Sequence, residues 1–270
     1  MSRASRLALT LCLVVAGRAV AQTGSDSLIP VADLPLMSVP TPRGRLLAVL
    51  LTGDGGWAVG DRSLAAAFVQ QDVAVVGLSS PRYLRHRPTP GEASDDLARI
   101  LRHYLAAWHR DRAIVVGYSR GADMAPFMVS RLAPALRSRL AMTVLLGPGP
   151  MASFRFALLD ILRNHTTSGG LPVAPEVAKL RGIPVLCIAG VRDRGAICAS
   201  LQAKGLARAV VRNGGHAVGA ADGPALVGVM LDALPRSGEQ RSPIALQVPA
   251  ASSPRLPEPA GPGASGASRG

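Results

Sequence analysis

The stretch Ala113-Ile-Val-Val-Gly-Tyr-Ser-Arg-Gly-Ala-Asp123 decides the fold. It joins a short apolar run, typical of a buried strand, to a segment with helical spacing, and the pattern G-x-S-x-G lies at their junction. This pattern is typical of a sharp strand-to-helix turn that presents a serine at its tip. We therefore predict that Ser119 is a nucleophile, and a tight turn without chemistry is the alternative.

Short apolar runs alternate with helical patterns on both sides of this stretch. The runs are residues 46–52, 73–78, 113–117, 141–146, 184–189 and 209–211, and the helical patterns are residues 63–71, 92–108, 123–132 and 224–234. Near-continuous apolar runs are typical of parallel strands that are covered on both faces. Repeated strand–helix–strand order, together with the serine turn, predicts an α/β-hydrolase fold with a doubly wound, mostly parallel sheet. Residues 148–181 interrupt the order and are predicted to form a short lid with a helical patch around residues 154–162.

A serine nucleophile needs a base, and the base needs an acid that orients it. In α/β-hydrolases the acid follows the serine along the chain, and the histidine follows the acid. Asp193 comes directly after the run that ends at residue 189, and His216 comes after the run that ends at residue 211. We predict Ser119, Asp193 and His216 as a catalytic triad, with Asp222 as the reserve acid. Ordinary surface loops are the alternative for Asp193 and His216.

Acyl transfer also needs two N–H donors for the developing oxyanion. The backbone of Arg120 is the first expected donor, because it follows the nucleophile. The second is expected from the loop Thr52-Gly-Asp-Gly-Gly-Trp57, with Asp54 at the donor position and Gly55 as the alternative. This loop lacks the phosphate-binding pattern G-x-x-x-x-G-K-[ST], and no dinucleotide fingerprint occurs, so we expect no nucleotide cofactor. We also expect no metal.

Both ends of the chain predict segments outside the folded domain. Residues 1–21 combine two early arginines with an apolar run and Ala19-Val-Ala21, which is typical of a secretory signal peptide; an uncleaved anchor is the alternative. Residues 236–270 are rich in Pro, Ser, Gly and Ala and predict a disordered tail. We therefore expect a periplasmic protein with a signal peptide at 1–21, a lead-in segment at 22–44 and one hydrolase domain at 45–235.

The charge and the cysteines add two further expectations. A formal net charge of +13 favours anionic partners, and arginine-rich codon usage is the alternative explanation. No nucleic-acid-binding motif occurs and aromatic residues make up only 3% of the chain, so we expect no specific nucleic-acid binding. Beyond the predicted cleavage site, Cys187 and Cys198 would form a disulfide in an oxidising periplasm, and two buried thiols are the alternative. Such a bridge would span the loop that carries Asp193.

Motifs spread over residues 45–230 resemble the bacterial virulence proteins VirJ and AcvB. The resembling segments are Thr52-Gly-Asp-Gly-Gly-Trp-Ala58, Arg82-Tyr83, Thr89-Pro90, Asp96-Leu97, His103-Tyr104, Gly117-Tyr-Ser-Arg-Gly-Ala-Asp123, Pro175-Glu-Val177, Cys187 to Cys198, and Gly214-Gly-His216. The resemblance implies a periplasmic serine hydrolase with Ser119, Asp193 and His216 as its triad. AcvB-like members are associated with removing the aminoacyl group from lysyl-phosphatidylglycerol, and VirJ-like members with type IV secretion.

The leading hypothesis is hydrolysis of the aminoacyl ester of an aminoacylated anionic phospholipid at a membrane surface. Arg82, Arg85, Arg87 and Arg120 would meet the lipid phosphate, Asp54 or a lid carboxylate would meet the amino group, and Trp57 is expected to contact the substrate. For the arginines, a solvated basic face is the alternative. The second hypothesis is a non-catalytic periplasmic adaptor that binds type IV secretion components. The third is an esterase for small soluble substrates.

Overall fold

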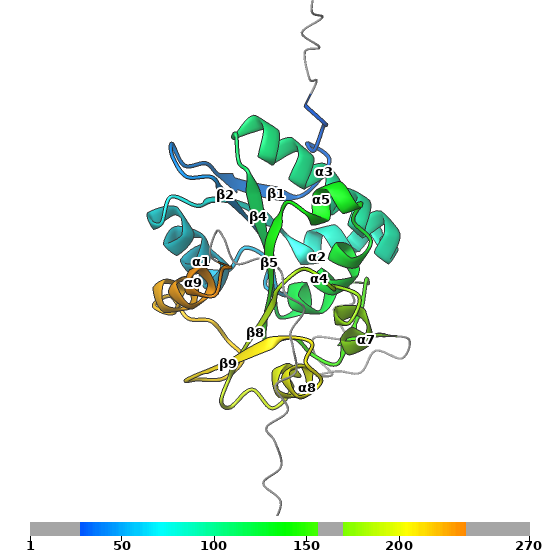
Figure 1. The fold of residues 1–270 in the computed structure, drawn as a ribbon, viewed down its shortest axis with the longest axis vertical. Coiled ribbons are helices and arrows are strands. Elements are labelled where there is room, and N and C mark those ends of the chain that lie inside the picture. The colour runs from blue at the N-terminus through cyan, green and yellow to red at the C-terminus, as the bar shows by residue number, and fades with distance from the viewer. Residues whose placement is uncertain (1–27, 156–169, 236–270) are drawn as a thin grey trace, which may run out of the picture. The chain divides into compact units, whose positions relative to one another are not determined.

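A seven-stranded sheet forms the centre of the computed structural model, which describes residues 28–155 and 170–235 (Figure 1). The strand order is β1-β3-β2-β4-β5-β8-β9, with β1 antiparallel to β3 and every other neighbouring pair parallel. The strands are β1 (Leu36–Val39), β2 (Leu46–Leu51), β3 (Ala74–Leu78), β4 (Arg112–Tyr118), β5 (Leu140–Leu146), β8 (Val185–Gly190) and β9 (Arg208–Arg212). The six parallel strands coincide with the six predicted apolar runs, which confirms the mostly parallel sheet.

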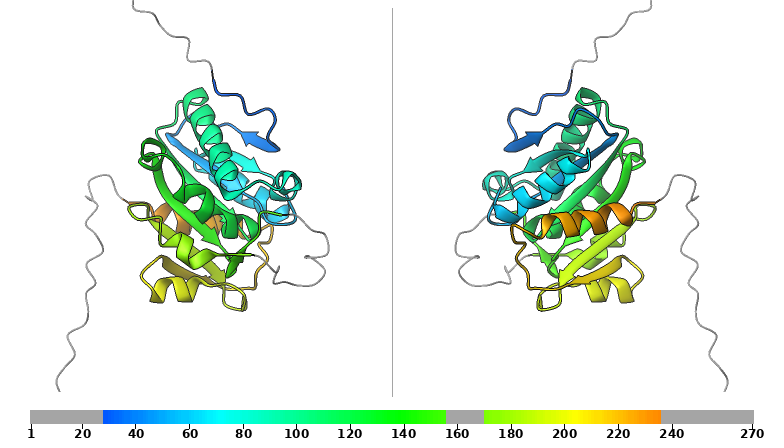
Figure 2. Two further views of the ribbon diagram at one scale, coloured as in Figure 1. Left: turned by 90° about the vertical axis from the view of Figure 1, so that its right-hand side faces the viewer. Right: turned by 90° about the vertical axis from the view of Figure 1, so that its left-hand side faces the viewer.

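Helices cover both faces of this sheet (Figures 1 and 2). On one face lie α1 (Val59–Gln70) and α9 (Gly223–Asp232), and on the other lie α3 (Pro90–Ala107), α4 (Arg120–Ser130) and α8 (Cys198–Ala203). Because strand side chains alternate between faces, β2 contributes Leu47, Val49 and Leu51 to one apolar cluster and Ala48 and Leu50 to the other. The described residues up to Leu234 belong to one compact unit.

Local signals explain where the longest helix begins. The side chain of Thr89 accepts a hydrogen bond from the Glu92 N–H at 3.2 Å, and the Glu92 carboxylate accepts one from the Thr89 N–H at 2.7 Å. This reciprocal pair satisfies backbone donors that have no partner within the first turn. α3 therefore starts at Pro90, two residues before the predicted helical pattern.

Shorter elements fill the connections between the main ones. After β3 come α2 (Ser80–Tyr83) and the 3₁₀ helix η1 (Leu84–His86), and α5 (Pro134–Arg137) precedes β5. In the predicted lid region, β6 (Met151–Ala152) pairs with β7 (Leu171–Pro172), and α7 (Val173–Val177) follows. The predicted helical patch around residues 154–162 lies almost entirely outside the described residues.

The predicted lead-in segment contributes a strand that the sequence pattern did not reveal. β1 pairs with β3 from Leu36↔Leu78 to Val39↔Val75, and Arg99 of α3 donates a hydrogen bond to Asp33 at 3.0 Å. This part of the lead-in is therefore an edge strand of the sheet. The predicted signal peptide and the predicted tail after Pro235 lie outside the described residues. Among the helices of the described ranges, none is both long enough and apolar enough to cross a bilayer.

Candidate active site

Ser119 lies at a strained turn between β4 and α4. Its backbone has φ 53° and ψ −120°, a left-handed region that L side chains rarely adopt. The flanking glycines permit the turn, because a Cβ atom at Gly117 would overlap the Gly121 carbonyl, and one at Gly121 would overlap the Leu51 carbonyl. The Ser119 N–H donates to the Leu146 carbonyl at 2.9 Å, which anchors the turn to the end of β5. The G-x-S-x-G pattern thus forms the strand-to-helix turn that the sequence predicts.

The structure brings Ser119, His216 and Asp193 into one chain of hydrogen bonds. His216 Nε2 lies 2.8 Å from Ser119 Oγ, and His216 Nδ1 lies 2.8 Å from Asp193 Oδ2. Since an ionised carboxylate only accepts hydrogen bonds, Nδ1 donates to Asp193 and Nε2 is left to accept the proton of the Ser119 hydroxyl. The Asp193 side chain is 7% exposed and the His216 side chain 47% exposed, so the base faces solvent and its orienting acid does not.

Two glycines allow the loops around the histidine to approach one another. A Cβ atom at Gly190 would overlap the Gly215 carbonyl, so the loops after β8 and β9 pass in direct contact. Gly147, at the end of β5, has φ 64°, and a Cβ atom there would lie 3.0 Å from His216 Cε1 and 3.2 Å from Asp193 Oδ2. The backbone of residue 147 therefore passes directly beside the His216–Asp193 pair.

Two residues that the sequence did not single out hold the His216 loop. Arg212, the last residue of β9, donates hydrogen bonds to the Gly215 carbonyl at 2.8 Å and the Ala217 carbonyl at 2.6 Å. The Tyr118 ring stacks on the His216 ring with their centroids 5.9 Å apart, and its hydroxyl accepts a hydrogen bond from the Val218 N–H at 3.1 Å. The position of Tyr118 next to the predicted nucleophile was the available signal, since that residue must lie beside the base.

The reserve acid, Asp222, has other partners. Its carboxylate accepts a hydrogen bond from the Gly219 N–H at 2.7 Å and lies 3.6 Å from Arg212 Nη1. Asp222 therefore supports the loop behind His216, and the hydrogen bond to the imidazole comes from Asp193.

The predicted oxyanion loop lies against the nucleophile. A Cβ atom at Gly53 would lie 3.1 Å from Ser119 Cβ, and the Gly56 N–H donates to the Gly53 carbonyl at 3.1 Å, closing a turn over Asp54 and Gly55. In the described part of the chain, no acceptor is bonded to the backbone N–H of Asp54, Gly55 or Arg120. These three amides thus remain available beside Ser119.

Asp54 and Arg120 are joined by an ion pair. Arg120 Nε donates to Asp54 Oδ1, and Arg120 Nη2 donates to Asp54 Oδ2 at 3.1 Å. The sequence suggested that Arg120 would meet a lipid phosphate and that Asp54 would meet an amino group. In this structure the two charges instead satisfy each other in a two-pronged contact. Their side chains instead link the two segments whose amides are the expected oxyanion donors.

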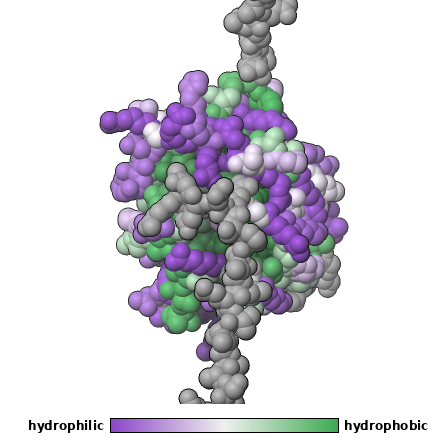
Figure 3. All heavy atoms as spheres, viewed as in Figure 1, coloured by the Kyte–Doolittle hydropathy of each residue, from purple (hydrophilic) through white to green (hydrophobic). Residues whose placement is uncertain are grey.

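The predicted substrate-binding residues lie farther along the same edge of the sheet. Trp57 packs its ring over β3, where a Cβ atom at Gly77 would overlap it, so the indole belongs to the packed layer. Arg82, Arg85 and Arg87 are exposed on α2, η1 and the residue after it, and in the described ranges no acidic side chain pairs with them. Hydrophilic residues also predominate on the face in Figure 3.

Cys187 and Cys198 form a disulfide with their Cα atoms 5.3 Å apart. Cys187 lies within β8 and Cys198 begins α8, so the bridge closes the segment that contains Asp193. The Ile197 N–H also donates to the Pro148 carbonyl at 3.0 Å, which joins this segment to the loop after β5. The predicted disulfide is therefore present and restrains the loop that carries the acid.

The sequence matches one known protein family. The model of the family described as "VirJ: Bacterial virulence protein (VirJ)" matches residues 45–237, which covers more than half of the chain. The chain belongs to the VirJ family. A search of curated proteins found no match to the sequence.

Solved structures that resemble this family member are α/β-hydrolases with low sequence identity. A predicted CIB-like hydrolase from Thermoplasma acidophilum is 16% identical, with a TM-score of 0.51 over 73% of this chain and 89% of the other. The proline iminopeptidase of Mycobacterium smegmatis is 13% identical, with a TM-score of 0.51 over 76% and 96% of the two chains. The naproxen esterase of Bacillus subtilis is 12% identical, with a TM-score of 0.50 over 73% and 85%. At these identities the likeness shows the fold alone, and it confirms the predicted α/β-hydrolase architecture.

Other family-motif residues in this VirJ-family chain stabilise the packing. The Tyr83 hydroxyl donates to Asp96 at 2.7 Å, which joins α2 to α3. The buried Glu176 accepts hydrogen bonds from Ser130 and Arg131 and, at 2.8 Å, from Lys179. Burial raises the pKa of Glu176, but these three donors outweigh it and hold that pKa below its usual value. α7 is thereby fixed to the end of α4.

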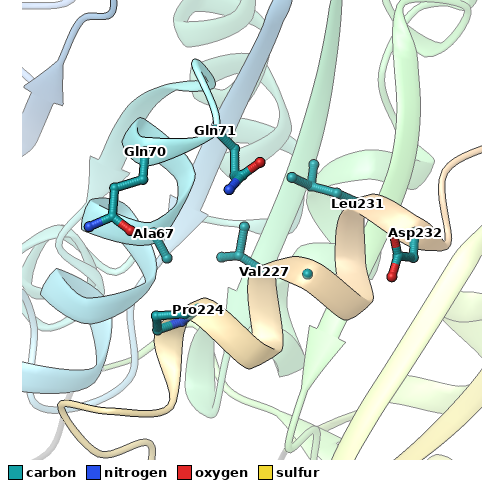
Figure 4. Close-up of a pocket in the computed structure, with 8 residues that line it drawn as sticks. Ala67, Gln70, Gln71, Pro224, Val227, Leu231 and Asp232 are labelled. Carbon is teal, nitrogen blue, oxygen red and sulfur yellow. The ribbon is translucent and has the colours of Figure 1, made fainter.

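A separate hollow of about 170 Å³ lies between α1 and α9 (Figure 4). No residue of the Ser119–His216–Asp193 chain lines it. Its walls come from Ala67, Gln70, Gln71, Pro224, Val227, Gly228, Leu231 and Asp232. Within the described residues, no group of His, Cys, Asp or Glu side chains is arranged to hold a metal ion.

Proposed function

We propose that this VirJ-family protein is an exported serine hydrolase that cleaves an ester. The observation that carries the proposal is the hydrogen-bonded chain from Ser119 through His216 to Asp193, with each contact at 2.8 Å and the serine at a strained strand-to-helix turn. An acyl-transfer site needs this set of nucleophile, base and orienting acid. The α/β-hydrolase neighbours agree with a hydrolytic function but carry only the fold.

In this mechanism His216 Nε2 takes the proton of Ser119 Oγ as that oxygen bonds to the ester carbonyl carbon. The tetrahedral intermediate collapses, the bond to the leaving alcohol breaks, and His216 returns its proton to the alcohol oxygen. A water molecule, deprotonated by the same nitrogen, then attacks the acyl carbon. The bond to Ser119 Oγ breaks, His216 returns the proton to that oxygen, and the acid is released. Asp193 stabilises the imidazolium that forms in each half of the reaction.

The oxyanion would be held by the backbone N–H of Arg120 and by that of Asp54 or Gly55. These amides lie beside Ser119, and the ion pair between the Asp54 and Arg120 side chains joins the two backbone segments. Donors that are already fixed need no reorganisation when charge develops, which is why such sites contribute strongly to rate.

For the substrate, we favour the aminoacyl ester of an aminoacylated phosphatidylglycerol, reached from the periplasmic side of the membrane. The resemblance to AcvB-like proteins motivates this choice, and two physical features support it. The chain carries a formal net charge of +13, and Arg82, Arg85 and Arg87 are exposed. Basic side chains at a surface attract anionic headgroups.

The test incubates the chain that begins at Gln22 with lysyl-phosphatidylglycerol vesicles and measures released lysine. We expect the native protein to release lysine. In Ser119→Ala the rate of release should fall by at least about 10³-fold, because removal of a triad residue abolishes most of the catalysis. Ser138→Ala is the matched control, because Ser138 is exposed at the far end of the sheet, before β5.

The other outcomes separate the alternatives. If lysine is not released but Ser119 reacts with a fluorophosphonate probe, the hydrolase stands and the lipid substrate is wrong; turnover of short soluble esters then supports a small-substrate esterase. If Ser119 does not react and Ser119→Ala fully restores type IV secretion in a deletion strain, the protein is a non-catalytic adaptor.

A further inference from the structure

A carboxylate that the proposed triad does not use lies one helical turn from Ser119. The N–H of Asp123 donates to the Ser119 carbonyl at 3.1 Å, so Asp123 belongs to the first turn of α4. Side chains four residues apart share one face of a helix, with their Cβ atoms about 5–6 Å apart. The Asp123 carboxyl therefore lies on the first turn of the helix that the nucleophile begins.

The loop after β5 connects Asp123 with the other side of the site. The Gly149 N–H donates to Asp123 Oδ1 at 2.6 Å, while Gly147, two residues earlier, lies against His216 and Asp193. Two residues of extended chain span at most about 7 Å. His216 and Asp123 thus flank the same short loop.

The charge of Asp123 is not balanced by a cation of its own. In the described part of the chain no ion pair joins Asp123 to a cationic side chain, and Arg120 is engaged by Asp54. Burial raises the pKa of Asp123 to about 7, although the Gly149 N–H and the charge of Arg120 oppose that rise. The ionised form of this carboxyl is therefore costly until a cation approaches it.

We propose that Asp123 binds the α-ammonium group of an aminoacyl ester whose carbonyl carbon is attacked by Ser119. This deepens the proposed serine-hydrolase function and rests on it. In an aminoacyl group the nitrogen lies about 2.5 Å from the carbonyl carbon, across two bonds. That short span matches a carboxylate one helical turn from the nucleophile. A side-chain ammonium such as that of lysine lies four methylene groups farther away.

Two consequences follow for specificity. The contact selects a free α-amino group, which every aminoacyl ester shares, so alanyl and lysyl esters are both accepted. An ester without the amino group, or with an acylated one, leaves the Asp123 carboxylate unpaired and is disfavoured.

The experiment compares alanine benzyl ester with propionic acid benzyl ester, which differ only in the amino group. We expect the native protein to prefer the alanine ester by about ten- to a hundred-fold in kcat/KM, the range for a charged hydrogen bond. In Asp123→Asn the ratio of the two kcat/KM values should fall by about ten- to a hundred-fold. Asparagine can still accept the Gly149 hydrogen bond, so the loop stays anchored. Asp95→Asn is the matched control, because Asp95 is exposed on α3.

A second measurement does not depend on any variant's folding. Alaninamide should inhibit propionate-ester hydrolysis by the native protein more strongly than propionamide does. Equal inhibition, or equal kcat/KM for the two esters in the native protein, overturns the α-ammonium site and leaves the serine hydrolase standing. An unchanged ratio of the two kcat/KM values in a folded Asp123→Asn variant also overturns it. If neither ester is cleaved and Ser119 does not react with a fluorophosphonate, the proposed function and this inference both fail.

The ratio of the two kcat/KM values should also change with pH. It falls below the pKa of Asp123, about 7, and above that of the substrate amine, near 7.7–8.0 for an ordinary α-amino group. A change that affects the hydrolysis of both esters equally cancels in the ratio. The other charged groups that act on Asp123 are Arg120 of the same helix and Asp54 of the loop after β2, which are paired with each other. A ratio that is flat between pH 5.5 and 9 contradicts the proposal.

Discussion

At the scale of single residues, side chains that do no chemistry themselves set the geometry of the Ser119 site. The ion pair between Asp54 and Arg120 joins the loop after β2 to the start of α4, and these are the two segments that supply the proposed oxyanion donors. Gly147 leaves room for the imidazole of His216. Each of these features can be tested by a substitution that leaves the triad intact.

Breaking the Asp54–Arg120 ion pair should slow the reaction more than it weakens substrate binding. We expect Asp54→Asn and Arg120→Gln each to lower kcat about ten-fold, less than the loss of a whole oxyanion donor, with little change in KM. Both substitutions remove the same ion pair. The kcat of the double variant should therefore be no lower than that of the slower single variant. Steady-state kinetics on a soluble ester, measured for the native protein, both single variants and the double variant, tests this coupling. Arg208→Gln is the control, because Arg208 is exposed on β9. Additive losses in the double variant contradict the coupling.

Gly147→Ala should reduce hydrolysis by displacing His216. A Cβ atom would lie 3.0 Å from His216 Cε1, at a residue whose φ is 64°. The left-handed backbone adds a cost of about 1 kcal/mol to folding. Gly182→Ala is the matched control, since it has φ 81° with no atom within 4 Å of its Cβ position. Both variants should lose similar stability in urea unfolding, but only Gly147→Ala should lose about ten-fold or more in kcat. Unchanged kcat in both variants excludes crowding at His216.

At the scale of elements, α1 contains a buried carboxyl that opposes folding at neutral pH. Asp61 is 2% exposed, and its carboxylate lies 3.4 Å from the Ala58 N–H that it caps. Burial raises the pKa of Asp61 from 3.8 to about 6, against the lowering effect of that N–H. The folded state therefore binds a proton more tightly than the unfolded state does between these two values.

The free energy of unfolding should fall as the pH rises from about 4 to about 6, because the folded state must give up this proton. Asp61→Asn should flatten that part of the curve and stabilise the protein at pH 7 by on the order of 2 kcal/mol. Urea unfolding at several pH values measures the difference, and Asp95→Asn, at an exposed position on α3, serves as the control. Asp123, with its pKa raised to about 7, adds a slope of the same sign that this variant leaves in place. If the free energy of unfolding changes with pH in the same way in the native protein and in Asp61→Asn, that would falsify the assignment of the slope to Asp61.

Loss of the disulfide should lower the rate of hydrolysis before it unfolds the protein. It joins β8 to α8 across the segment that holds Asp193, so its loss frees the acid first. We expect the Cys187→Ala/Cys198→Ala variant to lose about 2–4 kcal/mol of stability and to show a lower kcat at temperatures where it remains folded. Circular dichroism and ester hydrolysis, followed side by side as reductant is added to the native protein, measure the order of events. Hydrolysis that is indifferent to reductant contradicts this role.

At the scale of the whole molecule, much of the arginine content serves the fold. Arg110 donates to the carbonyls of Thr41, Arg43 and Gly44, and Arg137 donates to those of Val129, Ser130, Lys179 and Arg181. These contacts satisfy carbonyls at the ends of strands and helices. The net charge of +13 is therefore in part a structural feature, and only some of it is available to an anionic surface.

Removal of β1 should destabilise the entire sheet. A chain that begins at Pro40 loses the pairing of Leu36–Val39 with β3 and exposes the edge of that strand. We expect the Tm to fall by on the order of 10 °C, which corresponds to a few kcal/mol for a domain of this size. A chain that begins at Leu28 is the control and should match the chain that begins at Gln22. Thermal unfolding and size-exclusion chromatography detect the loss and the aggregation that an open edge promotes. An unchanged Tm means that β1 adds no stability.

Local patterns in the sequence predict the parallel strands, the main helices, the serine turn and the three side chains that the structure brings together. Each depends on signals that are local in the chain: apolar runs, helical spacing, and the residues that directly follow a strand. Parallel strands then place their carboxyl ends at one edge, so Ser119, Asp193 and His216 converge although 97 residues separate the first from the last.

The pairing of charges, by contrast, depends on the tertiary structure. Arg120 and Asp54, 66 residues apart, meet because a glycine at residue 53 brings their loops into contact. That contact pairs the two charges that we expected to meet a ligand. The antiparallel β1 was missed for the same reason, since four residues of an edge strand carry too little pattern to reveal their partner. Pairing depends on the approach of distant segments, and no local pattern in the sequence records that approach.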